Sequence, residues 1–251
     1  MQEVTPDSLV IDGIQTNFIH SEDFIRFSPL EIYESGDLIT MRLYYRLQDV
    51  ETDRRIGIYN RQETNGASVT YTLSEPYFSK GWFPCKQDLP DKADSAYIFL
   101  TVPDSLMAGS NGLLTNIKQL DNGFKRYEWK TYFPIAYYLL SLSVADYIDY
   151  SFMASTADGD SVLVQNFIYN DSLYFKENKD DIDATAEMIE LFSQKFGTYP
   201  FKQEKYGHCV APMGGGMEHQ TMTTLVNFGF NLPVPTGRIF GLTRDLPVME
   251  S

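Results

Sequence analysis

Over the first 150 residues, hydrophobic and polar positions alternate within short stretches, which is the pattern of half-buried β-strands. Turn residues such as Asp12-Gly13 and Asn111-Gly112 separate these stretches, because Asn and Gly tolerate the positive φ that tight turns require. The predicted strands are Ser8–Ile14, Asn17–Phe27, Leu38–Leu47, Ser68–Leu73, Ala96–Pro103, Lys125–Thr131 and Tyr137–Val144. Short strands at this spacing predict an antiparallel β domain.

The pattern changes after about Tyr150. Ser161–Tyr169 is predicted to be a further strand, whereas the apolar residues of Asp180–Phe196 recur at helical spacing. Acidic residues in the first turn of this predicted helix and Gly197 after its last turn are helix start and stop signals. Pro200 prevents the helix from continuing.

We therefore expect the chain to divide near residue 150. The predicted fold class is mainly β with a minor α/β part. An N-terminal β domain would occupy residues 1–150, a second part residues 151–232, and an atypical tail residues 233–251.

Composition and charge narrow the function classes. The 251 residues are 43% hydrophobic, which is enough to form a sizeable core. Asp and Glu total 34 against 20 for Lys and Arg, giving a net charge of -14 that repels phosphate backbones and anionic lipid. No apolar run approaches the roughly 18 residues of a membrane span, and the first residues do not resemble a signal peptide. We expect neither nucleic acid nor a membrane as a partner, and the compartment stays open.

Cysteine and histidine are both scarce. Two cysteines, Cys85 and Cys209, are too few for a disulfide scaffold or a four-cysteine zinc site, and Cys85 is expected to be a small buried hydrophobe. The three histidines are His20, His208 and His219. Each one alone is expected to be a hydrogen-bonded polar residue rather than a metal ligand.

The least ordinary stretch runs from Ala211 to Thr221. Three consecutive glycines, Gly214–Gly216, leave the backbone open to an extended ligand, and Glu218 follows as an anchor for a cation. A phosphate cradle is the competing interpretation, but no Lys, Ser or Thr stands at the required offset. A glycine-rich loop with a solvated glutamate is the simplest alternative.

A second glutamate stands among aromatic residues. Glu75 ends a predicted strand and is followed by Pro76, so partial burial would require a charged partner for its carboxylate. Taken alone, Glu75 is better explained as a paired structural residue.

Together these two stretches resemble a known family. Gly215–His219 resembles the Gly-x-Met-Glu-Asn exopeptidase motif of the zinc aminopeptidases related to aminopeptidase N and leukotriene hydrolase, in its Gly-Gly-Met-Glu-His-Gln-Thr variant. The resemblance extends from roughly Ser8 to Phe230. The other segments that carry it, in chain order, are Thr72-Leu73-Ser74-Glu75-Pro76, Trp82-Phe83-Pro84-Cys85, Asp91-Lys92-Ala93, Val102-Pro103, Ser110-Asn111-Gly112, Pro134-Ile135-Ala136 and Phe196-Gly197-Thr198-Tyr199-Pro200-Phe201.

The resemblance implies a fold and a substrate site. The fold would be a saddle-like antiparallel β domain followed by the opening of a thermolysin-like catalytic domain. Glu218 would bind the free α-amino group of a peptide, and Glu75 would be the second acidic contact. His219 stands where many relatives have Asn. The residues assigned in this way to the substrate's amine and backbone are Glu75, Gly215, Gly216, Met217, Glu218 and His219.

The family's zinc helix is missing from this sequence. It carries a His-Glu-x-x-His motif, in which two histidines bind zinc and the glutamate acts as general base. His208 and His219 are eleven residues apart and lack that pattern. Where the zinc helix should begin, Asn231–Phe240 contains two prolines and a glycine, and a proline inside a helix costs about 3 kcal/mol. No catalytic residue or metal ligand is assigned to the chain.

The first functional hypothesis is the N-terminal part of a zinc-dependent metallo-aminopeptidase, a hydrolase that removes N-terminal residues from peptides. The parent protein would use zinc, whereas this chain would bind peptide or protein N-termini without a cofactor. We expect the chain to be a fragment, because the family's opening strands are short or absent before Ser8. The alternative is a natural pseudo-enzyme or peptide-binding module. A calcium-binding module rests only on Asp158-Gly159-Asp160, which is ordinary turn chemistry. Surface exposed by truncation could promote self-association.

Overall fold

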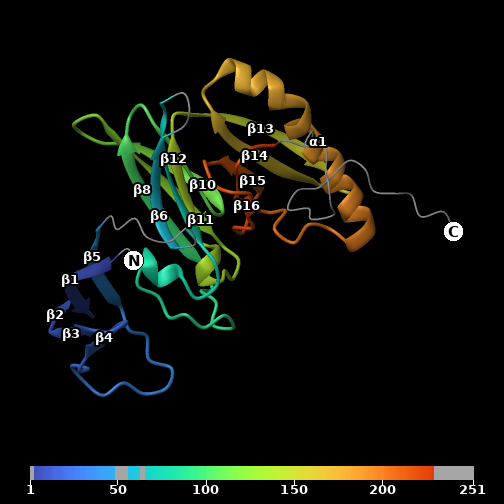
Figure 1. The fold of residues 1–251 in the computed structure, drawn as a ribbon. Helices are drawn as coiled ribbons and strands as arrows, with labels where there is room; N and C mark the ends of the chain where they lie inside the picture. Colours follow the sequence, from blue (N-terminus) through green and yellow to red (C-terminus); the bar gives the residue numbers. More distant parts are fainter. Residues whose placement is uncertain (1–2, 49–55, 63–65, 229–251) are drawn as a thin grey trace.

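The computed structural model describes residues 3–48, 56–62 and 66–228, in which β-sheets follow one another from the N-terminal end to a long helix (Figure 1). The N-terminal end holds a three-stranded antiparallel sheet in the order β2-β1-β5 and a two-stranded hairpin of β3 and β4. These strands are β1 (Glu3–Ile11), β2 (Ile14–Thr16), β3 (Phe18–Ser21), β4 (Phe24–Phe27) and β5 (Met41–Gln48).

The middle of the molecule contains two antiparallel sheets. One has the strand order β6-β7-β12-β9 and the other β10-β11-β8. Their strands are β6 (Ile56–Gln62), β7 (Ser68–Ser74), β8 (Ala96–Pro103), β9 (Met107–Ser110), β10 (Leu113–Gln119), β11 (Phe124–Thr131) and β12 (Leu142–Ala145). Two short 3-10 helices, η1 (Ser79–Gly81) and η2 (Tyr137–Leu139), lie in the connections.

The last part of the described chain forms a mixed five-stranded sheet in the order β13-β14-β15-β17-β16. The pairs β14–β15 and β15–β17 are parallel, and the others are antiparallel. The elements are β13 (Tyr147–Ser155), β14 (Ser161–Tyr169), α1 (Ser172–Phe196), β15 (Tyr206–Val210), β16 (Gly216–Met217) and β17 (Thr223–Leu225). Because α1 buries Ile182 and Ile189, it covers β13 and β14 on one side of this sheet.

The mainly β fold class is confirmed, and most predicted strands exist with shifted ends. Ala96–Pro103 agrees residue for residue, whereas Asn17–Phe27 is a hairpin whose turn places Glu22 at φ 53°. The prediction of one strand over Tyr137–Val144 was wrong. This stretch begins as η2 and becomes strand β12 only at Leu142. Before that point, the Ser141 amide donates to the side chain of Asn111 rather than to a neighbouring strand. From Leu142 on, the chain pairs with β9 on one side and with β7 on the other.

The helix prediction was wrong about where the helix begins. Helix α1 starts at Ser172, where the Asp171 carboxylate caps it by accepting hydrogen bonds from the amides of Leu173 (2.8 Å) and Tyr174 (3.1 Å). The first turn consequently has no acidic residue, and the acidic run lies further along the helix. Gly197 ends the helix with φ 92° and ψ 169°, a positive-φ conformation that favours glycine but differs from the left-handed helical one.

The expected boundary at residue 150 falls inside β13, and the change from antiparallel to mixed sheet occurs one strand connection earlier, at Asp146. A division into domains there stays a prediction. The predicted tail, residues 233–251, lies outside the described residues. Among the residues that the structure describes, no helix combines the length and apolar composition needed to cross a lipid bilayer.

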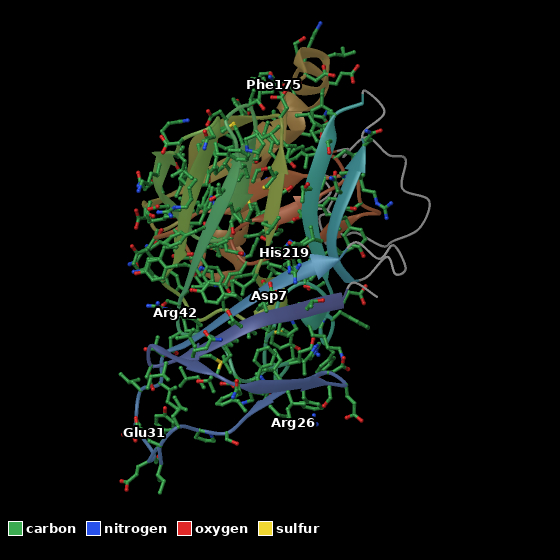
Figure 2. The ribbon with its side chains drawn as sticks, turned by 90° about the vertical axis from the view of Figure 1, so that its left-hand side faces the viewer. Asp7, Arg26, Glu31, Arg42, Phe175 and His219 are labelled. Atoms are coloured by element: carbon green, nitrogen blue, oxygen red, sulfur yellow. The ribbon has the colours of Figure 1, made fainter. Side chains whose placement is uncertain are left out.

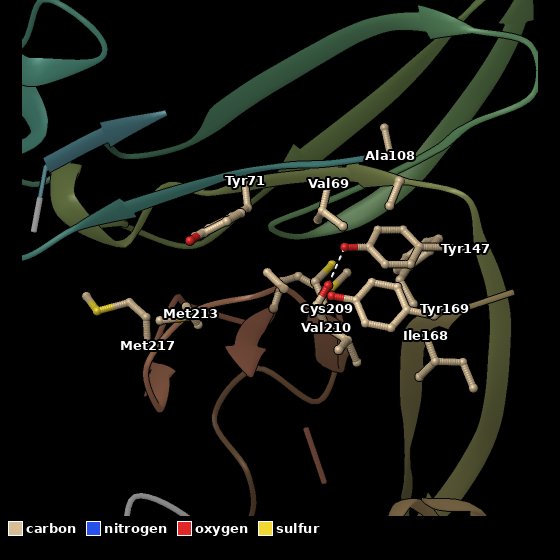
Figure 3. Close-up of a cluster of buried hydrophobic side chains, with 14 of the residues drawn as sticks. Val69, Tyr71, Ala108, Tyr147, Ile168, Tyr169, Cys209, Val210, Met213 and Met217 are labelled. Carbon is tan, nitrogen blue, oxygen red and sulfur yellow. Dashed lines mark hydrogen bonds between the residues drawn. The ribbon is translucent and has the colours of Figure 1, made fainter. Parts of the chain in front are cut away.

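The main hydrophobic core lies between the four-stranded and the five-stranded sheets (Figure 3). Val69 and Ala108 face it from the first sheet, and Cys209 and Val210 from the second. The Tyr147 hydroxyl donates a hydrogen bond to the Val210 carbonyl within this core. Two sheets that arise from separate stretches of chain are thus packed into one body.

A fully buried amine joins the same sheets. Lys205 Nζ donates to the Ser110 carbonyl (2.8 Å) and to Gln165 Oε1 (3.1 Å), and it lies 3.8 Å from the centre of the Trp129 ring. Burial lowers the pKa of Lys205 well below its usual value. The amine is therefore a directional contact between β9, β11 and β14 rather than a surface charge.

We expect Gly109→Ala to destabilise the chain by about 1–3 kcal/mol, because small-to-large changes overpack a filled core. A Cβ at Gly109 would lie 2.4 Å from Cys209 Sγ and 3.1 Å from a ring carbon of Phe167. Cys209→Ala removes the first obstacle, so the double variant should lose less stability than the sum of the two single variants. Urea unfolding of all four proteins measures this coupling, and strictly additive losses would contradict the close approach of β9 and β15.

Candidate functional site

Glu75 lies immediately after β7, at the end of the four-stranded sheet, and its side chain is exposed. Its carbonyl accepts a hydrogen bond from the amide of Phe78 (3.1 Å), which closes a turn in which Tyr77 has φ 73°. A bulky residue at positive φ is uncommon. The Tyr77 amide donates to the hydroxyl of Tyr137 (3.2 Å), so η2 supports this strained turn.

The glycine-rich stretch leads from β15 into β16, which is an edge strand of the five-stranded sheet. Gly214 and Gly215 are exposed, and a Cβ at either position would meet nothing within 4 Å. Gly215 has φ 107°, a conformation that L side chains rarely adopt. Its carbonyl accepts from the Val226 amide (2.9 Å), and the Pro212 carbonyl accepts from the Tyr71 hydroxyl (3.1 Å). Hydrogen bonds to its carbonyl groups thus hold the loop, while Gly214 and Gly215 remain accessible to a ligand.

Glu218 follows β16 directly and has an exposed side chain. Burial, and after it the negative charge of Glu218, raises the pKa of the Tyr138 hydroxyl, so the carboxylate acts on this ring. Tyr138 packs edge-on against Tyr137, with 6.0 Å between ring centres. Because Tyr137 also holds the turn after Glu75, the tyrosine pair of η2 connects the two stretches that the sequence singles out.

Sequence reasoning did not select the two tyrosines as site residues. They follow Pro134-Ile135-Ala136, a segment that contributes to the family resemblance, but the stretch was interpreted as a strand. Only the hydrogen bond of Tyr137 with the Tyr77 amide and the electrostatic effect of Glu218 on Tyr138 identify their place beside the candidate site. The hydrogen bond from the Tyr71 hydroxyl to the Pro212 carbonyl was also missed, because 141 residues separate the two partners.

Met217 and His219 point into the protein on either side of Glu218. Met217 belongs to the hydrophobic core, and His219 is 1% exposed in the middle of the molecule (Figure 2). His219 Nδ1 lies 2.9 Å from Thr224 Oγ1, and Nε2 has no hydrogen-bond partner among the described residues. Burial lowers the pKa of His219 to about 3, so its ring is neutral at pH 7. A direct contact of His219 with the amine stays a prediction.

The described histidines do not fit a zinc site. His208 Nδ1 lies 2.7 Å from Asn166 Oδ1, and rings of Tyr206 and Phe228 pack edge-on against its imidazole. Within residues 3–48, 56–62 and 66–228, no cluster of three or more His, Cys, Asp or Glu side chains could hold a metal ion.

The remaining candidates for calcium binding or thiol chemistry are explained by ion pairs and by burial. Asp158 and Asp160 both form ion pairs with Lys202, at 3.1 Å and 2.8 Å, so this ammonium lies where a calcium ion would be expected. Burial raises the pKa of the Cys85 thiol to about 11 and that of Cys209 to about 12, so both thiols stay protonated at pH 7.

Comparison with known proteins gives a fold relationship. No protein-family model and no curated protein sequence matches the chain. Among solved structures, it is similar to an M1 zinc metallopeptidase from Deinococcus radiodurans, with a TM-score of 0.74, 22% sequence identity, and coverage of 91% of this chain and 51% of that one. A mutant of the Deinococcus radiodurans M1 zinc metallopeptidase bound to the substrate Tyr-Ser-Ala gives a TM-score of 0.71 and 23% identity, with 88% of this chain and 50% of the other covered. A two-domain M1 zinc metallopeptidase mutant bound to L-arginine gives 0.72 and 22%, with the same coverage.

These structures have the fold that the sequence resemblance predicts, which confirms the fold prediction for the described residues. The chain spans about half the length of the structures it matches. At this level of identity, the similarity establishes the arrangement of the backbone.

We expect the protonation of His208 to destabilise the chain below pH 6.5. Burial lowers the pKa of His208 to about 4, so between pH 6.5 and about 4 the unfolded state binds a proton that the folded state does not. The free energy of unfolding should fall by up to about 3 kcal/mol across this window, since one pKa unit corresponds to about 1.4 kcal/mol.

Chemical unfolding at several pH values measures this loss, and His208→Gln should remove that part of the slope. His20→Gln, which changes an exposed histidine on β3, is the matched control and should leave the slope unchanged. A wild-type slope retained in His208→Gln would show that this imidazole is not the responsible group.

Proposed function

We propose that this chain is the substrate-amine-binding part of a zinc-dependent aminopeptidase, an enzyme that removes N-terminal residues from peptides. The observation that carries the proposal is an edge strand, β16, whose glycine-rich approach is open and whose end carries the exposed carboxylate of Glu218. Glu75 supplies the second carboxylate of the proposed site from the end of β7.

The edge strand suits an extended peptide. Gly216 and Met217 pair with Leu225 and Thr224 of β17 on one side, and no described strand pairs with β16 on the other side. A peptide strand can add to such an edge by main-chain hydrogen bonds. Gly214 and Gly215 have no side chains to obstruct its approach. The loop therefore supports backbone recognition without selecting particular side chains.

The carboxylates give selectivity for a free N-terminus. An α-ammonium group donates charge-assisted hydrogen bonds to carboxylates, whereas an internal or acetylated amide has no charge to offer. Binding of an uncharged amide would leave the site's carboxylates without a cation, which penalises binding in the middle of a chain. Glu75 and Glu218 would thus fix the first residue of the peptide, and β16 would hold the backbone that follows.

In such an enzyme, zinc would supply the activation of water for peptide-bond hydrolysis. The described residues do not fit the metal, so the function proposed for them is to bind the amine and orient the peptide. The bound molecules of the similar structures, Tyr-Ser-Ala and L-arginine, each carry a free α-amino group, which makes Tyr-Ser-Ala a suitable probe.

We expect the chain to bind Tyr-Ser-Ala more tightly than N-acetyl-Tyr-Ser-Ala. Glu218→Gln and Glu75→Gln should each weaken binding of the free peptide by roughly 10- to 100-fold, since a hydrogen bond to a charged group contributes about 1.5–3 kcal/mol. Both variants should leave binding of the acetylated peptide unchanged.

Titrations followed by NMR or calorimetry give the dissociation constants. Glu177→Gln changes an exposed glutamate on α1 and is the matched control, for which wild-type affinity is expected. Equal affinity of the wild-type chain for the free and the acetylated peptide would refute the proposed amine site.

We further expect no hydrolysis of aminoacyl-arylamide substrates by this chain, with or without added zinc. The sequence has no His-Glu-x-x-His motif, and His208 and His219 each use Nδ1 in a hydrogen bond to another side chain. Release of the arylamine is measured by absorbance. Zinc-dependent release that a chelator abolishes would show that the chain builds a catalytic site from other residues.

A further inference from the structure

A single buried amide group ties together the segments that form the candidate site. Asn111 is 0% exposed and follows β9 in the turn to β10. Its Nδ2 group donates to the carbonyls of Leu139 (2.9 Å) and Gln220 (2.6 Å), and its Oδ1 accepts from the amide of Ser141 (2.7 Å). Both amide hydrogens and the carbonyl oxygen are therefore used, each by main chain.

The partners of Asn111 belong to the segments that carry the site. Leu139 is the residue after Tyr138, and Gln220 comes two residues after Glu218. A planar amide with two donors in fixed directions sets the separation of the two carbonyls that it bonds. Asn111 thus determines how the loop after Glu218 lies against η2, whose Tyr137 hydroxyl holds the turn that follows Glu75.

The neighbouring Gly112 adds a second contact to the same loop. Its amide donates to Thr221 Oγ1 (2.8 Å), and Thr221 itself has φ 61°. Gly112 has φ 72°, and a Cβ there would lie 2.0 Å from the Lys130 carbonyl oxygen, so only glycine fits this turn. The Asn111-Gly112 pair therefore holds two consecutive residues of the loop, Gln220 and Thr221, against the β domain.

We propose that Asn111 is a positioning residue, which sets the loop of Glu218 relative to Tyr137–Tyr138 and the Glu75 turn and thereby gives the site its selectivity for a free amine. The inference rests on the proposed amine-binding function. Asn111 touches no substrate in this role. It acts through the carbonyls of Leu139 and Gln220, which would face each other without a donor if the amide were removed.

Asn166 provides a matched comparison. It is also 0% exposed, and its amide is also used by two partners, the Tyr150 carbonyl (2.9 Å) and His208 Nδ1 (2.7 Å). Neither partner belongs to the glycine-rich loop, η2 or the Glu75 turn. Asn111→Ser and Asn166→Ser therefore remove the same group from equally buried places, and only the first touches the site.

The test measures the affinity ratio of Tyr-Ser-Ala to N-acetyl-Tyr-Ser-Ala for the 251-residue chain and both variants. Asn111→Ser should reduce the ratio about tenfold, and Asn166→Ser should keep it within about twofold, at a temperature where circular dichroism shows both folded. A purely structural role for Asn111 would lower the melting temperature and leave the ratio intact, which would overturn the inference.

Two further outcomes are distinguishable. If Asn111→Ser does not fold, Thr221→Val removes only the acceptor of the Gly112 amide and should reduce the ratio about threefold, and an unchanged ratio would overturn the inference. If the wild-type chain shows no preference for the free peptide, the proposed function fails, and the inference fails with it. If the wild-type preference survives in every variant, the function stands and the positioning role is wrong.

Discussion

Polar groups buried between the four-stranded and five-stranded sheets must find partners without water, and this constraint determines how the sheets meet. Among the described residues, Lys205 reaches the Ser110 carbonyl, the Tyr147 hydroxyl hydrogen bonds to Ser143 Oγ, and Asn111 reaches the Gln220 carbonyl. An unpaired buried polar group costs about 1–3 kcal/mol, so sliding one sheet over the other would incur several such costs at once. The apolar core supplies the attraction between the sheets, and these directional bonds select one register.

The candidate site depends on that register because its two halves come from different sheets. Glu75 ends β7 in the four-stranded sheet, and Glu218 ends β16 in the five-stranded sheet. Tyr137 accepts a hydrogen bond from the turn after Glu75, and the charge of Glu218 acts on Tyr138. Neither half alone carries more than one carboxylate of the proposed pair. The proposed selectivity for an ammonium group would consequently depend on how these two sheets meet.

The sequence allowed the local features to be predicted, since they depend on neighbouring residues. Ala96–Pro103 was placed correctly because it is a short run rich in β-branched and aromatic residues, and the glycine-rich stretch was singled out because three glycines leave the backbone without side chains. The start of α1 was misplaced because Asp171 caps it from outside the amphipathic pattern. The contacts of Tyr137 and Asn111 could not be predicted, since their partners lie up to 109 residues away and no local pattern signals them.

Successive side chains at the end of the edge strand point alternately into the protein and outward, so neighbouring residues of the motif have different roles. Met217 and His219 point into the core, so Glu218 between them has to point outward, as successive residues of an extended chain do. Met217 and His219 anchor the strand end from the inside, one by packing and the other by its hydrogen bond to Thr224. The exposed carboxylate of Glu218 thus lies between two inward-pointing neighbours that anchor the end of the strand.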